Sequence, residues 1–274
     1  MALVPRADDS NVPYYRNPTN GLIYAGGGDD VNCTLSVCPV ELTVYGYRPT
    51  LPGSITLIVL YALCMMIQIG LGVRYRAWTY MSAMVLGCLD EILGYVGRIL
   101  YYHNPWGQTG FIMQIVLITI GPVFFSAAIY VMIAKIVTYI SVSVSRFDPK
   151  WFYYFFIPFD IISLILQAAG GAISSTSNGG DSSGVNIALA GLSIQVITLF
   201  VFTVLCIDYA IRSRSLWTAQ TLSTSFKIMV PFLTLATILI FIRCCYRIYE
   251  LHQGYDRNST ALRDEKLFNA LEAS

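Results

Sequence analysis

The chain has 274 residues, of which 55% are hydrophobic and 12% are charged, and its formal net charge is +1 at pH 7. Soluble domains carry about a quarter charged residues, so a single soluble core would not absorb this much apolar sequence, whereas a lipid bilayer would. The small net charge excludes a partner held by bulk electrostatics, such as nucleic acid. The composition therefore predicts an integral membrane protein.

Six apolar segments are long enough to cross a bilayer, which takes about 20 residues of α-helix. In chain order they are Leu51–Val73, Trp78–Tyr101, Gly110–Val142, Trp151–Ile173, Gly184–Ile211 and Leu222–Tyr249. We therefore expect an all-α fold, a polytopic transmembrane helical bundle over residues 51–250. Pro122 lies inside the third segment and is expected to kink it.

Basic residues in the short connections between the segments predict the orientation of the protein in the membrane. They gather in the first, third and fifth connections, at Arg74, Arg76, Arg146, Lys150, Arg212 and Arg214. The second and fourth connections have none, and cytoplasmic loops carry the excess of Lys and Arg. The odd connections are therefore predicted to be cytoplasmic, which places the polar N-terminal tail, residues 1–50, outside. The basic residues after the sixth segment go against this rule.

Several features of the polar ends follow from this orientation. Asn32 and Asn258 each begin a sequon for N-glycosylation, and both would lie on the outer side. Cys33 and Cys38 would face an oxidising compartment, and a gap of four residues can close a tight loop, so we expect a disulfide. The other five cysteines lie in apolar runs, and the two histidines are far apart. We therefore expect no metal site.

The second segment carries three ionisable residues, Asp90, Glu91 and Arg98. Each charge costs about 3 kcal/mol at the centre of a span, whereas each Leu, Ile or Val returns only about 0.3–0.6 kcal/mol. The apolar residues of this segment do not offset three charges. We therefore expect the segment to enter the bilayer only with partner helices, which Gly87, Gly94 and Gly97 allow to approach closely.

Other segments add polar residues that share helix faces. Seven-residue spacing places Glu91 with Arg98, and Asp160 with Gln167, on one face of their helices. The full set is Glu91, Arg98, Gln114, Asp160, Gln167, Gln195, Arg243, Arg247 and Glu250. Acids and bases nearly balance, which favours a shared, mutually neutralised polar core, and ionisable residues inside a membrane usually serve a function. We expect Glu91, Arg98, Asp160 and Arg243 to form one site.

A structural interpretation of the same residues stays open. Arg243, Arg247 and Glu250 lie near a helix end, where long side chains can reach the interface and form salt bridges. Glutamines within spans can simply join helices, and Glu91 and Asp160 can belong to structural ion pairs. The sequence contains no phosphate-binding loop, nucleophile elbow or zinc-protease motif, so no cofactor and no catalytic residue is predicted.

Short motifs along the chain resemble the RTA-like family, the fungal lipid-translocating exporter family. They cover residues 33–271 and include Tyr45-Gly46-Tyr47-Arg48-Pro49, Glu91-Ile92-Leu93-Gly94-Tyr95-Val96-Gly97-Arg98, Ala127-Ala128-Ile129-Tyr130, Asp160-Ile161-Ile162-Ser163, Gln167-Ala168-Ala169-Gly170-Gly171, Gly191-Leu192-Ser193-Ile194-Gln195 and Ile242-Arg243-Cys244-Cys245-Tyr246-Arg247-Ile248-Tyr249-Glu250. The residues shared with the family include all nine of the polar set. The pair Cys33 and Cys38 also resembles the family's outer tail.

The resemblance implies a seven-helix fold with its N-terminus outside and a part in the export of amphipathic lipids, sphingoid-base-like or sterol-like. It also implies resistance to toxic lipids or drugs, in the fungal plasma membrane or in a vacuolar or endoplasmic reticulum membrane. Residues 251–274 resemble an outer loop and a truncated lead-in to the seventh helix. The expected partners are membrane lipid and the amphipathic substrate. A lipid-sensing seven-helix receptor and an intramembrane lipid-modifying enzyme are the alternatives.

Overall fold

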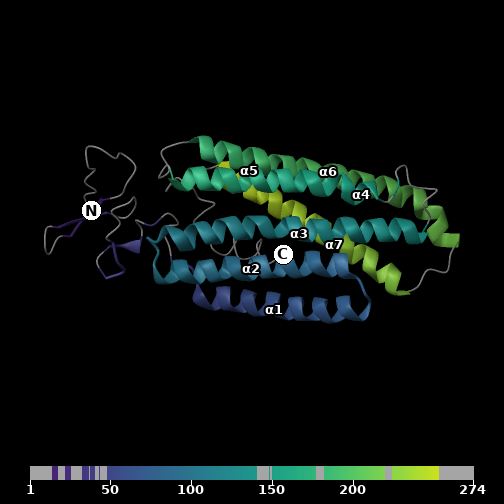
Figure 1. Cartoon of the computed structure of the whole chain (residues 1–274), viewed down its shortest axis with the longest axis horizontal. Helices are drawn as coiled ribbons and strands as arrows, with labels where there is room; N and C mark the ends of the chain where they lie inside the picture. The colour runs from purple at the N-terminus through teal and green to yellow at the C-terminus, as the bar shows by residue number, and fades with distance from the viewer. Residues whose placement is uncertain are drawn as a thin grey trace.

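The computed structural model describes residues 14–17, 22–25, 33–36, 38–40, 43, 48–140, 148, 150–176, 182–219 and 224–252. Its helices are α1 (Leu51–Arg74), α2 (Trp78–His103), α3 (Gln108–Ile140), α4 (Trp151–Tyr154), α5 (Phe156–Thr176), α6 (Ser182–Ala219) and α7 (Thr224–His252). Strands β1 (Tyr14–Arg16) and β2 (Ile23–Ala25) pair antiparallel, with Tyr15 opposite Tyr24. The long helices run side by side along the longest axis of the molecule, and the strands lie beyond one end of the bundle (Figure 1).

Helix α3 occupies the centre of the bundle. It packs against α2 on one side and against α5, α6 and α7 on the other, while α1 packs against α2. Helices α5 and α6 form a closely packed pair, and α7 crosses the bundle obliquely between that pair and α3 (Figure 1). Groups on the inward faces of α3 and α7 are therefore near several other helices.

The predicted membrane bundle is confirmed by five helices that are long and apolar enough to cross a bilayer, namely α1, α3, α5, α6 and α7. Their exposed faces carry large apolar side chains such as Leu63 of α1, Ile197 of α6 and Phe232 of α7. In water such faces would be costly, but lipid solvates them. Helix α2 has 26 residues but lies outside this set, because its charges lower its hydropathy.

The fourth predicted segment was wrong in one respect, because it is not one continuous helix. Helix α4 ends at Tyr154 and α5 begins at Phe156. Pro158 accounts for the break, since its ring conflicts with the carbonyl of Tyr154 and it has no N–H to donate. A proline in the first turn of a new helix carries neither penalty. Helix α6, which corresponds to the fifth predicted segment, extends past the predicted limit at Ile211, to Ala219.

Apolar and polar interiors occupy different parts of the bundle. An apolar cluster fills the half near the end of α3 and the starts of α5 and α7, with Val137, Ile140, Phe156 and Phe226 among its members. The buried ionisable and amide side chains lie between this cluster and the opposite end: Glu91, Arg98, Gln114, Asp160, Gln167, Gln195 and Arg243. In the predicted orientation the apolar half is cytoplasmic and the polar part lies toward the outside.

The N-terminal tail docks on the end of the bundle where α2 joins α3. A disulfide joins Cys33 and Cys38, whose Cα atoms lie 5.5 Å apart, and both pack with Trp106 of the α2–α3 turn. The Arg48 guanidinium lies 3.6 Å from the centre of the Tyr102 ring, and Arg48 Nε donates to the Tyr102 carbonyl oxygen at 3.0 Å. The predicted glycosylation sites Asn32 and Asn258 lie outside the described residues.

Candidate polar site within the helical bundle

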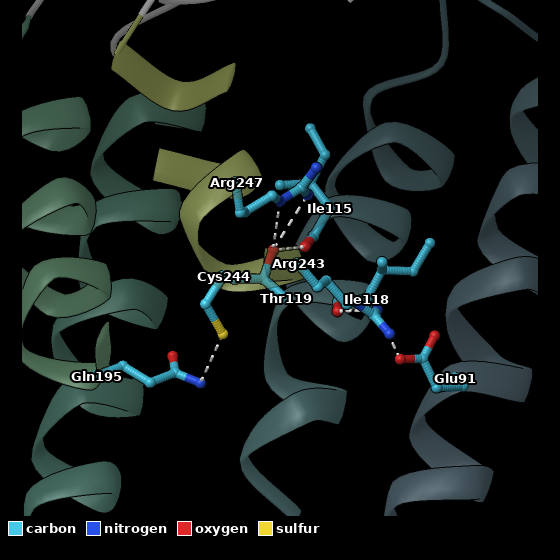
Figure 2. Close-up of polar contacts among 8 residues, drawn as sticks. All are labelled: Glu91, Ile115, Ile118, Thr119, Gln195, Arg243, Cys244 and Arg247. Atoms are coloured by element: carbon cyan, nitrogen blue, oxygen red, sulfur yellow. Dashed lines mark hydrogen bonds and ion pairs between the residues drawn. The ribbon is translucent and has the colours of Figure 1, made fainter. Parts of the chain in front are cut away.

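The centre of the site is a buried ion pair between α2 and α7. Arg243 Nη2 lies 2.7 Å from Glu91 Oε1, and neither side chain is more than 7% exposed. The two residues are 152 positions apart in the sequence, and Figure 2 shows their side chains meeting beside α3. Removing one partner of such a pair leaves an uncompensated buried charge, which costs about 3–5 kcal/mol. The pair therefore ties α7 to α2.

Pro122 supplies a second acceptor for the same guanidinium. Because proline has no N–H, the carbonyl of Ile118, four residues earlier in α3, loses its intrahelical hydrogen bond. Arg243 Nη2 donates to this Ile118 oxygen at 3.0 Å. The helix-breaking residue inside α3 thus creates a carbonyl that the arginine of α7 satisfies, as Figure 2 shows.

Gly121 provides the space for the Glu91 carboxylate. A Cβ atom at residue 121 would lie 2.5 Å from Glu91 Oε1, the oxygen that accepts from Arg243. Real Cβ atoms do not come this close, so any larger side chain would move the carboxylate or separate α2 from α3. The Gly121-Pro122 dipeptide therefore shapes the ion pair without contributing a functional side chain.

Arg247 lies one turn further along α7 and contacts Thr119 of α3. Its Nε and Nη2 atoms lie 3.2 Å and 3.1 Å from Thr119 Oγ1. The threonine hydroxyl donates in turn to the Ile115 carbonyl oxygen at 2.6 Å, so its oxygen is free to accept from the arginine. Two arginines one turn apart on the same face of α7 therefore bind adjacent residues of α3, Ile118 and Thr119 (Figure 2).

A chain of amides continues from α7 to α6 and α5. Gln195 Nε2 lies 3.8 Å from the Cys244 sulfur, and Gln167 Nε2 donates to Gln195 Oε1 at 2.9 Å and to Ser163 Oγ at 2.8 Å. Cys244 follows Arg243 directly, so α7 joins this chain to the ion pair. Gln167 Oε1 is buried and has no hydrogen-bond partner among the described residues.

Asp160 lies in a separate polar cluster between α5 and α3. Ser126 Oγ is 3.2 Å from Asp160 Oδ2, and Tyr130 interacts with the same carboxyl group. Ser126 lies eight residues along α3 from Ile118, which is about 12 Å at 1.5 Å per residue. We expected Asp160 to join Glu91 and Arg243 in one site. The structure instead has two clusters, because α5 and α7 contact α3 at different heights.

The remaining members of the predicted polar set are placed as follows. Arg98 and Gln114 are each 1% exposed, on α2 and α3. A Cβ atom on Gly97, the neighbour of Arg98, would lie 2.8 Å from the Gln114 backbone nitrogen, so the two backbones approach closely here. The side chain of Glu250 lies outside what the structure describes. Among the described residues no group of three His, Cys, Asp or Glu side chains could hold a metal ion.

Several residues of the site carry no obvious chemical signal in the sequence. Thr119, Ser126, Tyr130, Ser163 and Cys244 lie within apolar runs and look like ordinary helix residues. One signal was available: a proline within a helix frees the carbonyl four residues earlier, and buried carbonyls need donors. That rule applied to Pro122 points to Ile118, but the identity of the donor depends on which helix packs there.

Long apolar helices around a buried polar interior define a polytopic α-helical integral membrane protein. The sequence matches the family described as RTA1-like protein over residues 84–274, which is most of the chain. The chain belongs to the RTA1-like family. No solved structure matches it.

Three relatives come from Saccharomyces cerevisiae. The sphingoid long-chain base transporter RSB1 of strain S288c is 28% identical over 251 residues, which cover 77% of this chain and 65% of that protein. Protein RTM1 is 30% identical, over 69% of this chain and 63% of its own length. Protoporphyrin uptake protein 1 is 31% identical, over 62% and 56% respectively. The chain thus spans between 56% and 65% of the length of these relatives.

Proposed function

We propose that this protein moves single-chain amphipathic lipids across the membrane, with the headgroup received by the polar site and the hydrocarbon chain accommodated along apolar helix faces. The observation that carries the proposal is the connected set of buried polar groups that runs from Glu91 through α7 to Gln195 and Gln167. A bundle that only had to stay folded in lipid would not need these groups at its centre, since each is costly there.

The composition of the site fits a headgroup that carries an amine and hydroxyls. Carboxylate and amide oxygens accept hydrogen bonds from an ammonium or a hydroxyl, and guanidinium and amide nitrogens donate to hydroxyl oxygens. Gln167 Oε1 is a buried acceptor still open for such a contact within the described part of the chain. One relative is named as a transporter of sphingoid long-chain bases, which have this headgroup chemistry.

Two further parts of the proposal concern the setting. We place the protein in the fungal plasma membrane, with vacuolar or endoplasmic reticulum membrane as the other settings, and expect its activity to protect cells from toxic lipids or drugs. Another relative is named for protoporphyrin uptake, so amphipaths of other shapes are candidates too. The residues of the predicted set other than Asp160, which lies in a separate cluster, are proposed to bind substrate or to position the residues that do.

The test is lipid movement with and without the ion pair. Cells that express the protein are loaded with fluorescent dihydrosphingosine, and its release is followed. We expect Glu91→Gln to lower the release rate at least tenfold, because the carboxylate that holds Arg243 is lost. Asp208→Asn is the matched control: this carboxylate pairs with Arg212 in an exposed contact, and its removal should leave the rate unchanged.

The double variant Glu91→Gln/Arg243→Gln guards against a folding defect. It removes both charges, so it avoids the uncompensated arginine that Glu91→Gln leaves behind. We expect it to reach the membrane at the wild-type level and still not move lipid. Full activity of this double variant would contradict the proposal.

Mass spectrometry of the lipids separates the alternatives, since an enzyme yields a new lipid species and a receptor leaves the distribution unchanged.

A further inference from the structure

Asp160 is a buried acid that the Glu91–Arg243 pair does not neutralise. Its side chain is 1% exposed, near the start of α5. Within the described residues its carboxyl contacts two neutral groups of α3, the hydroxyls of Ser126 and Tyr130, and no Lys or Arg lies at ion-pair distance. The cluster of Asp160, Ser126 and Tyr130 therefore differs in kind from the ion pair, which balances its own charge.

An ionised carboxylate without a cation is costly in this position. Burial of an unpaired charge costs several kcal/mol even after relaxation, and two neutral hydroxyls offset only part of it. A proton on the carboxyl removes the charge altogether. The apolar cluster that includes Phe156 lies next to Asp160, so solvent does not lower the cost.

The hydrogen-bond geometry has room for that proton. The Ser126 hydroxyl lies 2.8 Å from the Val123 carbonyl oxygen, to which it donates, and 3.2 Å from Asp160 Oδ2. The hydroxyl has one hydrogen for these two acceptors, so Ser126 offsets an ionised carboxylate only in part, whereas a proton on Asp160 Oδ2 would supply a second hydrogen bond. Asp160 Oδ1 is buried without a hydrogen-bond partner among the described residues, and the Tyr130 hydroxyl interacts with the same carboxyl group. The Ser126 and Tyr130 hydroxyls thus supply two hydrogens for three acceptor oxygens, namely the Val123 carbonyl oxygen and the two carboxyl oxygens.

Few titratable groups face Asp160 from the helices around it. Helix α3 contributes Tyr130, and α7 contributes Cys244, whose thiol interacts with Tyr130. In the described parts of α4 and α6 no titratable group interacts with the carboxyl. Asp160 is therefore the one carboxylic acid of this cluster among the described residues.

We propose that Asp160 takes up and releases one proton in each transport cycle and so couples lipid movement to the proton gradient. The inference rests on the proposed function. A proton from one side of the membrane joins a carboxylate oxygen and leaves to the other side, so only an O–H bond is made and broken. Acids within transmembrane bundles act as proton relays in pumps and transporters. The distance from the ion pair, about 12 Å along α3, keeps the proton site apart from the headgroup site.

The experiment uses the full chain in phosphatidylcholine vesicles, with fluorescent dihydrosphingosine as the probe and the membrane potential clamped. The rate of lipid movement is measured with and without a pH gradient of about one unit, and protein-free vesicles correct for titration of the lipid amine. We expect the gradient to change the rate severalfold for the wild type and for the control Asp208→Asn. Asp160→Asn should still exchange lipid, at a rate that the gradient does not change.

Three results would overturn the inference. One is an unaltered response to the gradient in Asp160→Asn. Another is a loss of dihydrosphingosine binding in Asp160→Asn with binding of a lipid alcohol retained, which would make the carboxyl the amine site. The third is a wild-type rate that the gradient does not change. This result would leave the proposed function intact. No lipid movement by the wild type would instead count against the proposed function itself.

Tyr130→Phe provides a variant that keeps the carboxyl group and the packing. The ring lies 4.5 Å from the Phe202 ring centre and 5.5 Å from that of Phe156, and these contacts need no hydroxyl. Loss of the hydroxyl changes only the polar surroundings of Asp160. We expect the pH at which the rate is half-maximal to shift, and an unchanged pH profile would count against the proposal even if Asp160→Asn does not fold.

Discussion

Gly121 and Pro122 show how residues without functional side chains determine the chemistry of a site. The proline frees the carbonyl of Ile118, the glycine leaves space for the carboxylate of Glu91, and the guanidinium of Arg243 binds both. At this scale specific atoms, rather than a general polar environment, stabilise each buried charge. A small change in backbone shape should therefore disturb the ion pair as much as the loss of a charge.

We predict that Gly121→Ala lowers both the thermal stability of the purified protein and its rate of lipid movement. The added methyl group would overlap Glu91 Oε1 and displace it from Arg243, with a loss of about 3 kcal/mol if the pair breaks. The control is Gly171→Ala, whose Cβ would lie 3.7 Å from Val116 in ordinary contact. This control should be neutral or stabilising by up to about 1 kcal/mol. Equal melting temperatures for the two variants would contradict the assignment.

At the scale of elements, α2 is the helix whose position depends most on its neighbours. It is flanked by α1 and α3, and its glycines lie against α3: a Cβ on Gly94 would lie 2.6 Å from Ile118 Cγ1. Glu91 and Arg98 are buried among these neighbours, at 0% and 1% exposure. The helix exchanges lipid contact for protein contact along its charged face, which is how a segment with three charges can belong to a membrane bundle.

We predict that isolated α2 enters the membrane poorly and that the α1–α2–α3 unit enters well. Three charges cost about 9 kcal/mol at the centre of a span, more than about ten apolar residues return. Insertion is measured by glycosylation of reporter sites that flank the segment. The neutral variant Asp90→Asn/Glu91→Gln/Arg98→Gln should insert well even alone. If isolated wild-type α2 inserts as efficiently as isolated α1, the dependence on neighbours is refuted.

At the scale of the whole molecule, the two ends of the bundle differ in character. One end carries the docked tail, with the Cys33–Cys38 disulfide against Trp106 and Arg48 on Tyr102. The other end is closed by the apolar cluster, and the charged Asp208–Arg212 pair lies exposed near it on α6. A disulfide requires an oxidising compartment, so the docked tail agrees with an N-terminus outside.

We predict that the protein made in yeast carries a glycan at Asn32. Endoglycosidase treatment should increase its electrophoretic mobility, and Asn32→Gln should abolish most of that shift. Asn258→Gln is the matched control for the second sequon, which the orientation places on the same side. Modification of a cysteine placed at position 32 by a membrane-impermeant thiol reagent added only from the cytoplasmic side would contradict the orientation.

The sequence by itself determined the class of protein, most helix limits and the polar residues that matter for the interior. Hydrophobic length and the scarcity of charge do this, because the bilayer forces each apolar run of about 20 residues into a helix. The cost of an intramembrane charge likewise marks Glu91, Asp160 and Arg243 without knowledge of their neighbours. The break at Phe155 was available from Pro158, through local backbone chemistry, and was missed.

Only the tertiary structure decided which polar residues meet. Glu91 contacts Arg243 and not Asp160, because α7 crosses α3 at Ile118 whereas α5 meets α3 at Ser126. Helical periodicity gives the face on which a side chain lies, but the crossing point and height of two helices depend on packing between distant segments. Gly97 and Gly121 allow α2 and α3 to approach closely, and Gly170 does the same for α5 and α6, but no local sequence pattern indicates which helix will approach each glycine.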